Sequence, residues 1–141
     1  MEISVPVLIN TCYGGFSFSD DFLIEIFKIY GPDDRIFKSR PATEYDLNAY
    51  SRENVIHISS LKFKVIKNNY GEVYDYVKNM IYFINKDEVR FHPGIHAIYL
   101  RLGGSEYCSG MCSSLELVDI KYEIGITEFD GLEDVIVNRI R

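Results

Sequence analysis

Apolar residues at helical spacing predict two long helices. The first stripe, with its polar partners on the other face, consists of Phe22, Ile26, Ile29 and Tyr30. Ser19 precedes it and predicts an N-cap, because a serine hydroxyl accepts a hydrogen bond from an early backbone N–H. Gly31 and Pro32 end this helix, since proline cannot continue it. The second stripe lies between Pro93, at a typical first helical position, and Gly103, at a typical C′ position.

Apolar runs without that spacing predict strands. Residues 4–9 are apolar almost throughout, which is typical of a central strand that is buried on both faces. Shorter or alternating runs predict further strands at 55–58, 61–66, 80–84, 115–120 and 122–128. Turns are expected at 68–71 and at Asp130–Gly131.

Two segments have patterns that favour helix over strand. Val73, Tyr76, Val77 and Met80 have helical spacing, so a helix is expected over 72–79, before the strand at 80–84. The last segment, 132–140, is expected to form a short closing helix. Residues 32–53 form a polar excursion, with a short helix around 44–50. The elements together predict one α+β domain over 1–141, in which three or four helices cover a mixed sheet of about five strands.

Charge and composition exclude several classes of protein. The chain has 15 Lys and Arg against 21 Asp and Glu, a net charge of -6. Nucleic-acid binding is not expected, because phosphate recognition needs a basic face. The N-terminus lacks the basic and apolar regions of a secretion signal, and no segment has the length and apolarity of a transmembrane helix. We therefore expect a protein that is not secreted and has no membrane partner, with its three cysteines reduced.

The segment 10–19 is the main candidate for a ligand site. A strand, a glycine-rich loop and a helix start follow one another there, which is the arrangement of many phosphate-binding loops. The candidate ligand-binding residues are Asn10, Cys12, Tyr13, Gly14, Gly15 and Ser19. The loop contains no basic residue, and the acidic Asp20 and Asp21 would repel a phosphate. A purely architectural strand-to-helix turn is the favoured interpretation, and a sugar or base stacked on Tyr13 is the preferred ligand if one binds.

The cysteines and histidines offer weaker candidates. Cys12 is the one catalytic candidate, since a thiolate near a helix start can act as a nucleophile. It lies in no Cys–His motif, and a buried structural thiol is the simpler interpretation. Cys108 and Cys112 lack the second pair of a zinc knuckle. His92 and His96 are four apart near a helix start, where an N-cap and a surface histidine are expected. No metal and no cofactor are predicted.

Two parts of the chain resemble a family of small uncharacterised proteins found in phages and large DNA viruses. The first is the Asn-Thr-Cys-Tyr-Gly-Gly-Phe string at 10–16, which precedes a serine that opens a helix. The counterparts near the C-terminus are Arg90, His92–Pro93, Leu102–Gly103, 115–118 and 128–131. His92 stands where the family has aspartate, and the loop at 104–113 is enlarged. The resemblance implies a shared domain in a viral setting, in the host cytoplasm or the virion, and no reaction.

These observations favour a non-enzymatic interaction or binding module. The chain has 11 tyrosines and 9 phenylalanines, more than a small core requires, so some are expected at an interface with a protein partner or a second copy. One alternative is a protein that binds and sequesters a small molecule or nucleotide derivative through the Gly14–Gly15 loop. Another is a hydrolase or transferase that depends on Cys12.

Overall fold

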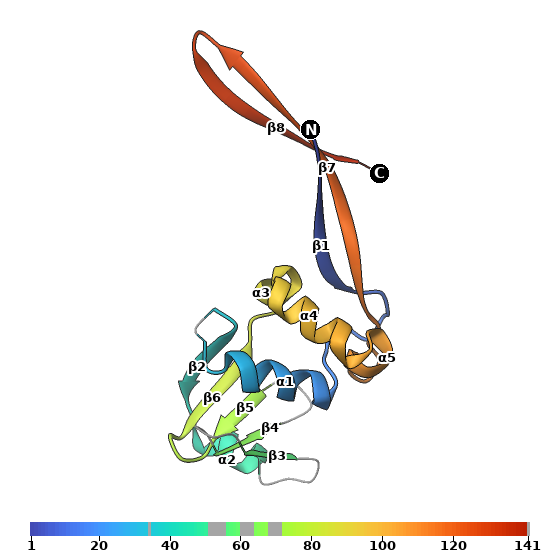
Figure 1. The fold of residues 1–141 in the computed structure, drawn as a ribbon. Coiled ribbons are helices and arrows are strands. Elements are labelled where there is room, and N and C mark those ends of the chain that lie inside the picture. The colour runs from blue at the N-terminus through green and yellow to red at the C-terminus, as the bar shows by residue number, and fades with distance from the viewer. Residues whose placement is uncertain (34, 51–55, 60–63, 68–71, 141) are drawn as a thin grey trace.

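A helical and sheet-containing body carries a long three-stranded arm (Figure 1). The computed structural model describes residues 1–33, 35–50, 56–59, 64–67 and 72–140. The helices are α1 (Asp20–Tyr30), α2 (Glu44–Tyr50), α3 (Lys86–Phe91), α4 (Pro93–Leu102) and α5 (Ser105–Cys108). The strands are β1 (Glu2–Asn10), β2 (Phe37–Pro41), β3 (Ile56–Ser59), β4 (Lys64–Lys67), β5 (Glu72–Asp75), β6 (Met80–Ile84), β7 (Leu115–Phe129) and β8 (Leu132–Ile140).

The predicted α+β class is confirmed, with the strands divided between two sheets. The body contains a five-stranded sheet in the order β2-β6-β5-β4-β3, and the arm is a three-stranded sheet in the order β1-β7-β8. Every named strand pair is antiparallel, so neither sheet is the mixed sheet that was expected. Helices α1, α4 and α5 lie between the five-stranded sheet and the base of the arm (Figure 1), and side chains from these helices and from both sheets form one buried core.

The two helices predicted from apolar spacing are present with the predicted ends. The Ser19 hydroxyl accepts a hydrogen bond from the Phe22 N–H at 3.2 Å, which confirms the N-cap of α1. Pro93 opens α4, and Gly103 follows it in the left-handed conformation with φ 108°. His92 caps α4 through its ring nitrogen, as expected. Helices α3 and α5 are short, and apolar periodicity did not reveal them.

The helix predicted over 72–79 is wrong. This segment forms β5 and a turn, because Val73 is fully buried opposite β6 in the sheet. The Asp75 carboxylate accepts hydrogen bonds from the N–H groups of Val77 and Lys78, which fixes the turn before β6. Burial in a hairpin thus outweighed the helical spacing, because that pattern extends over too few residues to decide between helix and strand.

The C-terminal segment also differs from the prediction. Residues 132–140 form β8 instead of a closing helix, and the two strands expected at 115–120 and 122–128 are one continuous strand, β7. Asp130 and Gly131 form the predicted turn with φ 52° and 84°. Positive φ at both positions matches the right-handed twist of a hairpin, so the turn directs 132–140 back along β7 as a strand.

Two further expectations are corrected by the sheet order. β1 is an edge strand of the arm and not a central strand, although its Val7 and Leu8 are both buried where the arm enters the body. The polar excursion at 32–53 contains the predicted short helix, α2, but β2 also lies in it and buries Phe37 in the core. The turn expected at 68–71, like residue 55 and residues 61–63 of the expected strands, lies outside the described residues.

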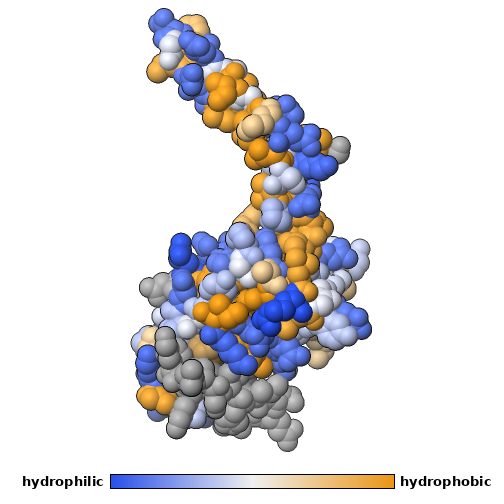
Figure 2. All heavy atoms as spheres, viewed as in Figure 1, coloured by the Kyte–Doolittle hydropathy of each residue, from blue (hydrophilic) through white to orange (hydrophobic). Residues whose placement is uncertain are grey.

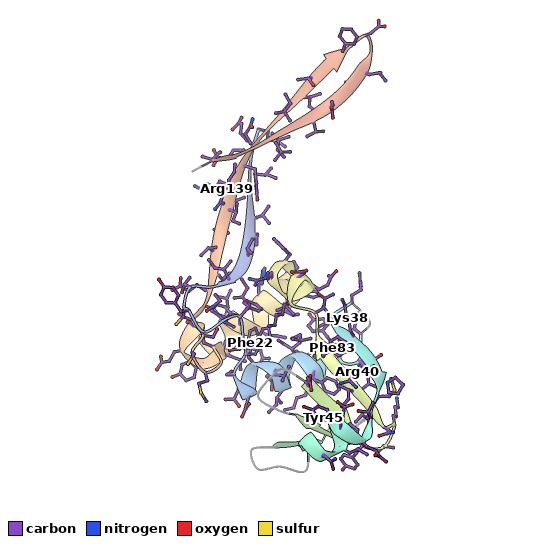
Figure 3. The ribbon with its side chains drawn as sticks, turned by 180° about the vertical axis from the view of Figure 1, so that it is seen from behind. Phe22, Lys38, Arg40, Tyr45, Phe83 and Arg139 are labelled. Carbon is purple, nitrogen blue, oxygen red and sulfur yellow. The ribbon has the colours of Figure 1, made fainter. Side chains whose placement is uncertain are left out.

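The main buried core, rich in aromatic residues, joins the helices to both sheets. Phe22 is fully buried, with its ring centroid 5.5 Å from Phe18 and 6.2 Å from Tyr99. Leu8 and Leu115 bring the base of the arm into the same core. Figure 3 labels Phe22 within the body, where these side chains converge. The arm is therefore anchored by its base, while its outer part leaves the core behind.

Candidate functional site

The predicted ligand loop packs against the loop that follows α4. Backbone hydrogen bonds join Thr11 N–H to Ser114 C=O at 2.8 Å and Ser19 N–H to Cys108 C=O at 2.9 Å. Between them, the Gly110 N–H donates to the Ser17 carbonyl at 3.1 Å. The loop 10–19 is therefore fixed along most of its length by its neighbour.

The Asn10 side chain hydrogen-bonds to both loops and holds them together, and we call these contacts the loop clamp. Its side-chain carbonyl accepts hydrogen bonds from the backbone N–H groups of Ser114, at 2.9 Å, and Cys12, at 3.2 Å. The Ser113 hydroxyl donates to the same oxygen at 3.3 Å, and the Asn10 amide N–H donates to the Cys12 carbonyl at 2.7 Å. An amide used so fully within the chain supports the architectural interpretation of this residue.

The glycines and Tyr13 do not converge on one point. A Cβ on Gly14 would lie 1.6 Å from the Cys112 carbonyl oxygen, so only glycine allows this close approach of the two loops. Gly15 has φ 86° and open space around it. Tyr13 is fully exposed and makes no part of a binding wall. The loop contains its glycines for backbone shape, as the architectural interpretation predicts.

A hollow of about 510 Å³ lies beside the start of α1. It is lined by Gly14, Ser17, Phe18, Ser19, Asp20, Ser109, Gly110 and Met111. Of the predicted ligand residues, only Gly14 and Ser19 reach it. The Ser19 hydroxyl donates to the Tyr107 carbonyl at 2.6 Å and accepts from Phe22, so it is already engaged within the protein.

Cys12 has no histidine partner among the residues whose side chains are described. It is exposed. His92 packs against the Tyr30 ring with centroids 4.8 Å apart. His96 was expected at the surface but is buried, with Nε2 2.7 Å from the Arg90 carbonyl, because the α3–α4 corner folds over it. His57 lies in β3, where side chains are not described.

The other two cysteines differ from each other. Cys108 is fully buried and its thiol donates to the Tyr99 carbonyl at 3.6 Å, so burial raises its pKa to about 11. A thiol with that pKa is a poor nucleophile and metal ligand at neutral pH. Cys112 is exposed. Across the described parts of the chain, no group of three or more His, Cys, Asp or Glu residues is placed to hold a metal ion.

The feature that sequence reasoning missed is the outer part of the arm. We call the strand pair of residues 121–140 the distal hairpin. Within it, Ile124 lies opposite Val137, and Ile126 lies opposite Val135, so the four side chains share one side of the sheet. We call these four residues the apolar face.

The apolar face is open to solvent. Ile126 is 63% exposed, Val135 55% and Val137 54%, while Ile124 is half-buried. Figure 2 shows apolar residues along the length of the arm, well beyond the body. The row continues toward the body through Tyr122, which lies opposite both Arg139 and the β1 residue Ile3.

The sequence does contain the signal for this hairpin. An Asp-Gly pair flanked by alternating apolar residues is the strongest short-range indication of a two-residue hairpin turn. Tyr122, Ile124 and Ile126 alternate before the turn, and Val135 and Val137 alternate after it. The helix prediction for 132–140 overlooked that the turn and the alternation agree.

The structure contains no helix, in the part of the chain that it describes, with the length and apolarity needed to cross a membrane. Comparison with known proteins adds no relative: no family model, curated protein or solved structure matches the chain, so the resemblance to the viral family stays a prediction.

Proposed function

We propose that this chain is a protein-interaction module whose docking surface is the apolar face of the arm. The observation that carries the proposal is the exposure of Ile126, Val135 and Val137 on one side of a hairpin that projects from the body. An exposed apolar row rimmed by polar residues is typical of a surface that associates with another protein.

Energetics support the same function. A two-stranded hairpin is at best marginally stable in water by itself, and beyond residue 124 the distal hairpin pairs with no third strand among the described residues. Each 100 Å² of apolar surface removed from water contributes about 2.5 kcal/mol. Covering the apolar face would therefore stabilise both the hairpin and the complex.

Binding of an apolar dye at low protein concentration tests whether the apolar face is an accessible docking surface. We expect 1-anilinonaphthalene-8-sulfonate fluorescence to rise with the native chain. The rise should fall sharply in the triple variant Ile126→Thr, Val135→Thr and Val137→Thr. Threonine keeps the β-branch that favours a strand, so the hairpin is retained while its face becomes polar.

A matched variant on the opposite side of the hairpin controls for the number of substitutions. Leu132, Ile136 and Ile140 lie opposite Phe129, Gly125 and Lys121, on the other side of the sheet. Changing all three to threonine should leave most of the dye signal. Equal dye binding by the native chain and both triple variants would refute the apolar face as the docking surface.

The hollow beside α1 supports a second candidate, a protein that binds a small molecule or nucleotide derivative. Its volume of about 510 Å³ falls within the range of ligand pockets. Among the residues that line it, Ser19 already has hydrogen-bond partners within the chain, which makes this candidate weaker. A rise in melting temperature with millimolar nucleotides, cyclic nucleotides or nucleosides would support it, and no rise with any of them would refute it.

A further inference from the structure

The apolar face lies between two charged rows of opposite sign. Toward the tip of the hairpin, Glu128 lies directly opposite Glu133, and toward the body Arg139 lies opposite Tyr122. All four residues point to the same side of the sheet as the apolar face, because side chains alternate along each strand. In order from the body, the rows are therefore cationic, apolar, apolar and anionic.

Neither charged row has a counter-ion among the described residues. Two carboxylates directly opposite each other on neighbouring strands destabilise a sheet. Neither Glu128 nor Glu133 forms an ion pair with another described residue, and Arg139 forms none either. All three side chains are exposed. Figure 3 labels Arg139 on the arm, well away from the body.

The four rows are evenly spaced about the centre of the apolar face, and the two charged rows at the ends are opposite in sign. The centre lies between the pair Ile124–Val137 and the pair Ile126–Val135, and one charged row follows on each side. A twofold rotation there stacks each apolar pair of one copy on the other apolar pair of its partner. The same rotation places Arg139 of each copy over the two carboxylates of the other. A twofold contact of this kind requires a surface that complements itself, and this surface does so in both apolarity and charge.

We infer that the occupant of the apolar face is a second copy of this chain, with the two distal hairpins packed face to face and antiparallel. This inference rests on the proposed function of the arm and adds the partner and its register. Sheets that pack in this way lie about 10 Å apart, which lets the apolar side chains interdigitate. The four rows span only about 20 Å along each strand, so the contact belongs to the small interfaces that associate weakly and reversibly.

Charge reversal on each side separately tests the register. One variant is Arg139→Glu, and the other is the pair Glu128→Lys and Glu133→Lys. Each variant alone would bring like charges together at both ends of its own dimer, so its dissociation constant should rise at least about tenfold, measured as molar mass by sedimentation equilibrium. The native chain should shift with concentration from 16.3 kDa toward twice that mass.

A mixture of the two charge-reversal variants gives the decisive measurement. In a mixed dimer, the new glutamate faces the new lysines at one end, and the native arginine faces the native glutamates at the other. An equimolar mixture should therefore recover dimers close to the native affinity. Misfolded variants cannot give this recovery, so a loss of association through unfolding is distinguished. Reversal of Lys121, which lies on the opposite side of the sheet, is the control and should leave the dissociation constant unchanged.

Three outcomes would overturn the inference. Charge variants that dimerise as well as the native chain would exclude the register. A native chain that stays monomeric while its apolar face still binds dye would exclude a second copy and leave another protein as the partner, so the proposed function would stand. A dimer whose apolar face still binds dye would show that the two copies associate through another surface, such as the edge of β8 or the opposite side of the hairpin.

Discussion

The body buries its apolar side chains, whereas the arm exposes apolar side chains of the same kinds to solvent. In the body, apolar residues from helices and both sheets are buried together, and Phe22, Phe27 and Phe37 are almost inaccessible to water. In the arm, β8 is exposed along its whole length although it contains Val135, Ile136 and Val137 in succession. The body therefore has the burial that a fold requires. The arm has apolar surface without burial, and the proposed docking function rests on this difference.

The comparison also separates two uses of polar residues. In the body, the polar side chains of Asn10 and Asp46 are hydrogen-bonded within the chain, Asn10 to the neighbouring loop and Asp46 in an ion pair with Arg40. On the distal hairpin, Glu128, Glu133 and Arg139 form no ion pair with described residues. These unpaired charges beside an apolar row are the observation behind the proposed contact with a second copy.

The largest difference between the two regions should appear with phenylalanine truncation. Phe22→Ala should lower the free energy of unfolding by about 3 to 5 kcal/mol, because it leaves a cavity among Phe18, Tyr99 and their neighbours. Phe129→Ala, at an 84% exposed position in the arm, should change it by less than about 0.5 kcal/mol. Urea unfolding of the two variants measures both values, and similar losses would mean that the arm is part of the cooperative core.

Removal of the loop clamp should have the next largest effect. Asn10→Ala should cost about 2 kcal/mol of unfolding free energy, because the N–H of Ser114 and the hydroxyl of Ser113 lose their acceptor. Asn138→Ala, on the exposed strand β8, is the matched change in the arm and should be nearly neutral. A neutral result at Asn10 would argue that the loop is held by its backbone hydrogen bonds alone.

Acid should weaken the body through the pair of Asp46 and Arg40. The guanidinium hydrogen bonds, at 2.6 and 2.8 Å, together with the Thr43 N–H, hold the pKa of the Asp46 carboxyl well below its usual range. A pKa that is lowered in the folded state contributes stability above the ordinary aspartate value of about 4 and loses it as the pH falls below that value. Asp46→Asn should therefore reduce stability near neutral pH by about 1 to 2 kcal/mol, limited by the 43% exposure of the Arg40 side chain.

In the Asp46→Asn variant, the free energy of unfolding should fall less than in the native chain as the pH is lowered from neutral to below about 4. Urea unfolding at a series of pH values measures this dependence. Arg40→Met should weaken this pH dependence as well, since it removes the other half of the ion pair. If both variants lose unfolding free energy at acid pH as steeply as the native chain, the pH dependence belongs to other carboxylates.

The smallest effect is expected at the turn of the hairpin. Gly131 has φ 84° with open space around it, so Gly131→Ala introduces backbone strain of about 1 kcal/mol and no clash. Amide hydrogen exchange in β8 should become about fivefold faster, and exchange in α1 and α4 should not change. Slower or equal exchange in β8 would show that the arm does not depend on its turn.

The parts of the fold that sequence predicted have local causes. The N-cap at Ser19, the helix from Pro93 to Gly103 and the Asp130–Gly131 turn each depend on side chains within a few residues of one another. The errors fell in two hairpins, where pairing with the adjacent strand decides the structure. Val73 lies in a strand because β6 covers it, and the segment at 132–140 is a strand because it pairs with β7.

The candidate site could be predicted only in part for a similar reason. The architectural use of Gly14 follows from its contact with Cys112, a residue 98 positions later, which no local pattern reveals. The apolar face was visible in the alternation of Ile124 and Ile126. It could be interpreted as an interface only when the structure showed that nothing in the described body covers it.

Side-chain accessibility on the apolar face, followed with protein concentration, tests the central claim most directly. Methyl groups of Ile126, Val135 and Val137 can be followed by NMR with a soluble paramagnetic agent, with the buried methyl groups of Leu8 as the reference. The account predicts strong relaxation of the three arm residues in dilute solution, its loss as dimers form, and no relaxation of Leu8 at any concentration. Arm methyl groups that stay accessible at all concentrations, or that are shielded even in the most dilute sample, would contradict it.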